Sequence, residues 1–80
     1  MHGMSEGEDE VLDARGMACP QPILKLAEAM KELKGGQLLK VLADDPGALE
    51  DIPVWCRRTG NHMISITEEG GTIVVFIRKK

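Results

Sequence analysis

Residues 16–30 read GMACPQPILKLAEAM, and most of this stretch has the periodicity of an amphipathic helix. Apolar side chains recur at positions 23, 24, 26, 27, 30 and 33, and charged ones fall at 25, 28, 31, 32 and 34. This spacing predicts a helix over residues 20–34 that buries one face and ends at Gly35-Gly36. The start of the helix is unusual, because two prolines follow Cys19 within three residues.

The Cys-Pro-Gln-Pro segment is compatible with a helix start. Pro20 biases Cys19 toward the extended angles that an N-cap residue adopts, and Pro20 itself suits the first helical position. Pro22 still falls within the first turn, where no intrahelical hydrogen bond is lost. We therefore predict that Cys19 lies at the mouth of the helix, with Pro20, Gln21 and Pro22 as the residues that support its position.

A cysteine at a helix N-terminus is favoured as a thiolate, because free N–H groups and the helix dipole stabilise an anion. The prolines leave the amides of Gln21, Ile23 and Leu24 as donors. Arg15 and Lys25 would add positive potential, and Met17 would contribute to a docking surface or be a plain loop residue. The alternative is that Cys19 is a buried, purely structural thiol.

The remaining sequence predicts four strands and a second helix. Residues 10–14 form a short strand, and residues 37–43 form a mostly apolar strand buried on both faces. Residues 62–67 alternate as an edge strand does, and Glu69-Gly70-Gly71 turns the chain into residues 72–78. These last residues are the most apolar and are placed inside the sheet. The order β-α-β-α-β-β with right-handed crossovers gives an α/β two-layer sandwich: a four-stranded mixed sheet with both helices on one face.

The second helix is predicted from the segment that begins at Asp44. Asp45 would cap it, with Pro46 at the first helical position. Pro53 would break or offset the helix, and Asp51 would cap the half that follows. Gly60-Asn61 would close it. The alternative, a carboxylate metal cluster of Asp44, Asp45 and Asp51, is less economical than capping.

Composition limits the classes of function. Eighty residues make one small domain, here residues 10–80, preceded by a disordered acidic leader over residues 1–9. A net charge of -3 and a single Trp and Phe argue against nucleic-acid binding. Two cysteines without a CxxC pair provide no zinc or dithiol redox motif, and no signal peptide or membrane span is evident. We expect a cytoplasmic protein with reduced thiols.

Two blocks, LDARGMACPQPILKL (12–26) and LLKVLADDPGALEDIPVWC (38–56), resemble the TusA/SirA-like family of sulfur carriers. The resemblance covers residues 11–78. It implies that Cys19 carries sulfur as a persulfide, received from a cysteine desulfurase and passed to an acceptor protein with a reactive cysteine. No metal or organic cofactor is implied. The sulfur would serve tRNA 2-thiouridine formation or related trafficking, in a sulfurtransferase-type relay protein rather than a stand-alone enzyme. Many relatives have a basic residue where this chain has Ala18.

Other residues have simpler interpretations. Cys56 is expected to be a buried structural thiol far from Cys19, Trp55 to pack the second helix onto the sheet, and His62 to be a surface or satisfied residue. Arg57-Arg58 suit the C-terminal dipole of the second helix. Two alternative functions stay open: a non-catalytic interaction or regulatory module with a structural Cys19, and an RNA-binding module. A thiol peroxidase or dithiol oxidoreductase would lack the required second thiol or histidine base.

Overall fold

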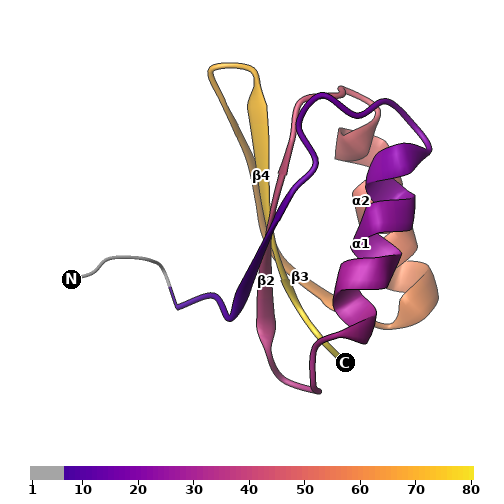
Figure 1. The fold of residues 1–80 in the computed structure, drawn as a ribbon, viewed down its shortest axis with the longest axis vertical. Coiled ribbons are helices and arrows are strands. Elements are labelled where there is room, and N and C mark those ends of the chain that lie inside the picture. The colour runs from indigo at the N-terminus through magenta and orange to yellow at the C-terminus, as the bar shows by residue number, and fades with distance from the viewer. Residues whose placement is uncertain (1–6) are drawn as a thin grey trace.

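The computed structural model describes residues 7–80, which form a four-stranded sheet with two helices on one face (Figure 1). The elements follow in the order β1 (Glu10–Asp13), α1 (Gln21–Lys31), β2 (Leu38–Ala43), α2 (Ala48–Thr59), β3 (His62–Glu69) and β4 (Thr72–Arg78). The predicted order and the two-layer α/β architecture are therefore confirmed. Six of the nine leader residues, 1–6, lie outside the described residues. Asp9 already pairs with β2, since its N–H donates to the Leu38 carbonyl at 2.8 Å.

The strands are ordered β1-β2-β4-β3, with β1 parallel to β2 and the other two pairings antiparallel. The prediction that residues 72–78 lie inside the sheet and residues 62–67 at its edge is confirmed. The β3–β4 turn is Gly70-Gly71, and both residues have positive φ. Such angles match the right-handed twist of a two-residue hairpin, and glycine adopts them without steric cost.

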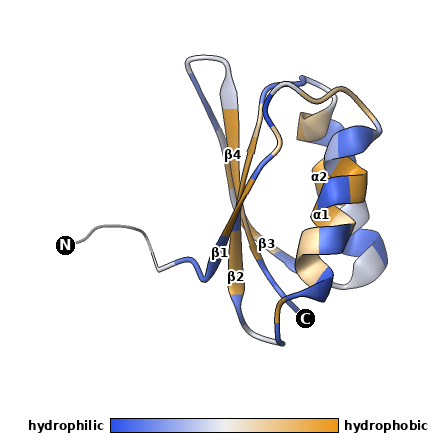
Figure 2. Cartoon of the chain, in the orientation of Figure 1, coloured by the Kyte–Doolittle hydropathy of each residue, from blue (hydrophilic) through white to orange (hydrophobic). Residues whose placement is uncertain are grey.

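The core lies between the sheet and the helices, as the apolar positions of the strands and helices in Figure 2 illustrate. Its largest fully buried side chains are Leu26, Leu39, Val41, Ile52, Ile73, Val75 and Ile77. Trp55 packs partly buried against this cluster, as predicted. The prediction that β2 is buried on both faces is wrong, because its residues alternate between buried and half-buried. The helices cover only one side of the sheet, so every second side chain of β2 lies on the open face.

The end of α1 and the start of α2 lie at other residues than predicted. Helix α1 ends at Lys31, three residues before the predicted end, and a turn then leads to Gly35-Gly36. Helix α2 begins at Ala48 rather than Pro46, and no side-chain cap is present at its N-terminus. The segment from Asp45 to Ala48 is instead a turn, in which the Ala48 N–H donates to the Asp45 carbonyl. The predicted capping role of Asp45 is therefore wrong.

The predicted break at Pro53 is also wrong, since α2 runs through this residue to Thr59. Pro53 is the sixth helical residue, so the ring removes a single intrahelical donor near the helix start. Burial of Ala48, Ile52 and Cys56 on the same helix face holds both halves of α2 against the sheet. Without a break, Asp51 has no second helix start to cap. As predicted, Gly60 closes α2 in a left-handed conformation.

Candidate functional site

The candidate site lies where two loops meet at one edge of the sheet. Because β1 and β2 are parallel, their carboxyl ends are adjacent, and so are the loops that lead from them into α1 and α2 (Figure 1). The first loop carries Cys19, and the second carries Asp44 and Asp45. This topology brings a thiol and carboxylates together from positions more than 25 residues apart in the chain.

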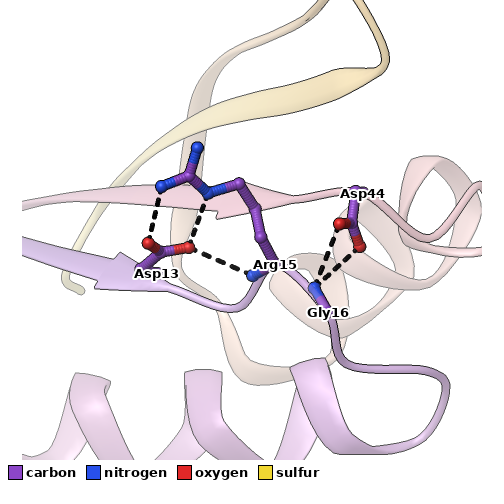
Figure 3. A network of polar contacts seen from close by, with 4 residues as sticks. All are labelled: Asp13, Arg15, Gly16 and Asp44. Atoms are coloured by element: carbon purple, nitrogen blue, oxygen red, sulfur yellow. Dashed lines mark hydrogen bonds and ion pairs between the residues drawn. The ribbon is translucent and has the colours of Figure 1, made fainter.

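Acidic side chains of the second loop bind the backbone of the first. The Gly16 N–H donates to both carboxylate oxygens of Asp44 at 3.0 Å (Figure 3). The Cys19 N–H donates to Asp45 Oδ2 at 3.3 Å. The two backbone N–H groups have no strand or helix partner in the loop, and the carboxylates act as their hydrogen-bond acceptors instead. Asp44 and Asp45 therefore fix the path of the cysteine loop.

Helix α1 starts one residue later than predicted. Pro20, with φ −98° and ψ 12°, occupies the N-cap, and Pro22 lies in the first turn. Cys19 therefore precedes the cap and lies in the loop, with its side chain exposed. The alternative that Cys19 is a buried structural thiol is therefore wrong, because the residue is exposed. Two of the amides predicted to face an anion are already used, because the Gln21 N–H donates to the Ala18 carbonyl and the Leu24 N–H to that of Pro20.

The thiol of Cys19 donates a hydrogen bond to Asp51 Oδ2 across 3.4 Å. Asp51 belongs to the first turn of α2, so this contact joins the two helices at their N-terminal ends. The hydrogen bond to Asp51, partial desolvation and the charges of Asp51 and Asp45 raise the pKa of Cys19 above its ordinary value. The predicted stabilisation of the thiolate is therefore wrong for the unbound protein, because the nearest charges are negative.

The predicted cationic helpers have other partners. The Arg15 guanidinium forms a two-point ion pair with Asp13, with Nε 2.9 Å from Oδ1 and Nη2 2.8 Å from Oδ2 (Figure 3). This pair lowers the pKa of Asp13 to about 2. Lys25 Nζ lies 3.7 Å from Glu28 Oε1 on the exposed side of α1. Met17 is half-buried in the loop. The roles proposed for Arg15, Met17 and Lys25 in docking stay predictions.

Beside Cys19, a shallow groove of about 380 Å³ runs between the two helices. Apolar residues line it from both helices, with Pro20 and Ile23 at the start of α1 and Val54 and Trp55 in α2. The charged residues of its lining are Glu50, Asp51 and Arg58. The sequence interpretation missed these α2 residues. The sequence did contain a signal for this proximity, namely the acidic residues after the predicted strand 37–43. In a parallel pair of strands, residues that follow the second strand lie near the loop that follows the first.

The other cysteine, the possible metal ligands and the helix lengths of residues 7–80 also bear on the predictions. Cys56 is buried in the core, as predicted, and is not joined to Cys19. No group of three or more His, Cys, Asp or Glu side chains in this part of the chain could share a metal ion. Within the same residues, neither helix is long and apolar enough to cross a membrane. His62 is exposed at the start of β3.

Fold and site together define a small α/β protein with a single accessible thiol at the end of an interhelical groove. The chain matches the model of the family described as sulfurtransferase TusA over residues 10–79. It therefore belongs to the TusA family of sulfur carriers.

Individual relatives agree with this assignment. The sulfur carrier protein TusA of Pseudomonas aeruginosa is 42% identical over 77 residues, which cover 96% of this chain and 98% of the relative. YrkI of Bacillus subtilis is 44% identical over 71 residues, covering 89% and 95% of the two chains. A SirA-like protein from Desulfitobacterium hafniense has a similar structure, with a TM-score of 0.76 and 25% identity over 86% of this chain and 95% of its own.

Proposed function

We propose that this protein carries sulfur as a persulfide on Cys19, accepting it from a cysteine desulfurase and passing it to a cysteine of an acceptor protein. The observation that supports this role is the exposed Cys19, which lines the groove between the two helices. Cys56, the other cysteine of the chain, is 2% exposed and has no path to a partner. Membership of the TusA family supports sulfur as the group that Cys19 carries.

Each transfer is a thiol–persulfide exchange. The Cys19 thiolate attacks the terminal sulfur of the donor persulfide, so that Cys19–S–SH forms and the donor cysteine leaves as a thiolate. An acceptor thiolate then attacks the terminal sulfur of Cys19–S–SH, and Cys19 leaves as a thiolate. One sulfur atom moves in each step and no oxidant is consumed. A single cysteine is therefore sufficient.

Sulfur loading tests this role directly. Reduced protein is mixed with a cysteine desulfurase, its pyridoxal phosphate and free cysteine, and intact and peptide masses are recorded. We expect a gain of one sulfur on Cys19 that a reductant removes, retained in Cys56→Ser and lost in Cys19→Ser. Loading that persists in Cys19→Ser, or fails with several desulfurases while Cys19 remains alkylatable, would contradict the proposal.

We further propose that the carried sulfur serves 2-thiouridine formation in tRNA or related sulfur trafficking. The destination is tested by removing the gene from its host and measuring 2-thiouridine in total tRNA. We expect the nucleoside to fall, and to be restored by the wild-type gene and not by Cys19→Ser. An unchanged 2-thiouridine level would direct the search to other sulfur acceptors in a cytoplasmic relay.

A further inference from the structure

The polar contacts of Cys19 come from the β2–α2 loop, which carries Asp45, and from the first turn of α2, which carries Asp51. The Cys19 N–H donates to Asp45 Oδ2, and its Sγ donates to Asp51 Oδ2. An ionised carboxylate has only acceptor sites, so the hydrogen bond to Asp51 exists only while the sulfur keeps its proton. The contact between Sγ and Oδ2 is therefore one that a thiol makes and a thiolate does not.

The charges that face this thiol are mainly negative. Asp45 and Asp51 contact Cys19, while Asp44 binds the neighbouring Gly16 and Glu50 lines the same groove. Arg58 is the cationic residue of the groove, and it lies about two helical turns beyond Asp51 on α2. From the α1 side, the groove receives Pro20 and Ile23, which are apolar. In the β1–α1 loop, Arg15 is held by Asp13.

Building on the proposed function, we infer that Asp51, with Asp45 beside it, is a positioning residue that holds Cys19 as a protonated thiol, and that the sulfur-exchanging partner brings a cationic side chain to these two carboxylates. The partner surface that fits is therefore a cysteine with a lysine or arginine next to it, set among apolar residues that enter the groove.

The chemistry of exchange explains why such a pairing would matter. The thiolate is needed both when Cys19 attacks the donor persulfide and when Cys19 leaves after transfer to the acceptor. Two adjacent carboxylates oppose that charge in each step. A cation that binds the carboxylates removes the opposition only while the partner is docked. Between encounters, the protonated sulfur is protected from oxidation and unspecific exchange, since the thiolate is the reactive form.

The same contact would act on the loaded protein. A neutral Cys19–S–SH accepts attack by an incoming thiolate more readily than an anionic persulfide, which repels it. A carboxylate beside the terminal sulfur favours the neutral form, because it disfavours a second negative charge. Asp51 thus keeps the carried sulfur electrophilic until an acceptor arrives.

The first test compares two substitutions that each remove one negative charge from the groove. The rate of Cys19 alkylation by iodoacetamide is measured against pH in the full chain, in Asp51→Asn and in Glu50→Gln, with circular dichroism as the check on folding. Asp51→Asn is expected to move the pH profile to lower pH and to raise the rate at pH 7 by about tenfold. Glu50→Gln, which keeps the hydrogen bond, is expected to change the rate much less. Coincident profiles for Asp51→Asn and wild type would overturn the inference.

The second test uses charged reagents in place of a partner. The trimethylammonioethyl and sulfonatoethyl methanethiosulfonates transfer the same kind of thioalkyl group to a thiolate, with methanesulfinate as the leaving group. Wild-type Cys19 is expected to react about tenfold faster with the cationic reagent than with the anionic one, after correction for their rates with free cysteine. Asp51→Asn is expected to reduce this preference. Equal corrected rates in the wild type would overturn the predicted preference for a cationic partner.

These measurements are independent of sulfur loading. If sulfur loads on Cys19 but Asp51→Asn leaves both the pH profile and the reagent preference unchanged, the inference fails and the carrier function stands. If Asp51→Asn shifts the profile while no desulfurase loads Cys19, the carrier function fails and the control of the thiol by Asp51 stands.

Discussion

Each of the two cysteines takes its reactivity from its immediate surroundings. Cys19 is exposed in its loop, and its thiol donates a hydrogen bond to the carboxylate of Asp51. Partners can therefore reach the sulfur, while the carboxylate favours its protonated form. Cys56 lies in the core with 2% of its surface exposed, and burial raises its pKa to about 11. One residue type thus supplies a reactive group in the loop and an inert packing group in α2.

The pKa of Cys56 predicts a loss of stability at alkaline pH. An unfolded chain releases a thiol proton near pH 9.0, whereas folded Cys56 holds it until about pH 11. Between these values the unfolded state binds fewer protons, so the free energy of unfolding falls as pH rises, by up to about 2–3 kcal/mol. Below pH 8 the contribution is fully present.

Urea unfolding followed by Trp55 fluorescence between pH 8 and pH 11 measures this loss. Cys19→Ser is used as the background, because the pKa of Cys19 is also raised and would add to the slope. A Cys56→Val variant in the same background is expected to show a shallower decline. Equal slopes with and without Cys56 would contradict this prediction.

At the level of elements, α2 depends on its C-terminal cap. Gly60 has φ 79° and ψ 10°, and its N–H donates to the Cys56 carbonyl at 2.9 Å. A side chain at this position meets the steric cost of the left-handed region, and its Cβ would lie 3.1 Å from Lys80 Cδ. The lysine chain is flexible, so the backbone term dominates.

We therefore predict that Gly60→Ala lowers the free energy of unfolding by about 1 kcal/mol, measured by urea denaturation. Gly60→Asn is the matched variant, because asparagine tolerates the left-handed region, and it is expected to recover part of the loss. Equal losses for alanine and asparagine would point to the contact with Lys80 as the cause.

The elements were largely predictable from local patterns, and their ends were less so. The apolar run located residues 72–78 without error, since this run and the Gly70-Gly71 turn before it are local signals. The predicted start of α2 was wrong because aspartate is a common N-cap residue, but the Asp45 carboxylate accepts a hydrogen bond from the Cys19 N–H instead. Pro53 was given too much weight, because tertiary burial of Ile52 and Cys56 outweighs one missing donor.

At the scale of the whole molecule, two leucines of α1 show what packing adds. Leu26 is 0% exposed between the helices and the sheet, whereas Leu24, two residues earlier on the same helix, is 58% exposed. Their chemistry and helix propensity are identical. Any difference between them on truncation therefore reports the tertiary environment.

We predict that Leu26→Ala lowers the free energy of unfolding by about 2–5 kcal/mol, through lost burial and the cavity left behind. Leu24→Ala is expected to change it by less than about 1 kcal/mol. Chemical denaturation of both variants checks this. Comparable losses would mean that α1 is seated on the sheet in a different rotation.

The sequence alone determined the order of the elements, the internal position of β4 and the placement of Cys19 before a proline-stiffened helix start. These features follow from short-range periodicity, turn residues and the local angles that proline imposes. Only the tertiary structure decided the surroundings of the thiol. Asp45 and Asp51 stand 26 and 32 residues from Cys19 in the chain, and they reach it because parallel β1 and β2 deliver both loops to one edge of the sheet. Local patterns do not encode that encounter, since it depends on how α1 and α2 pack side by side.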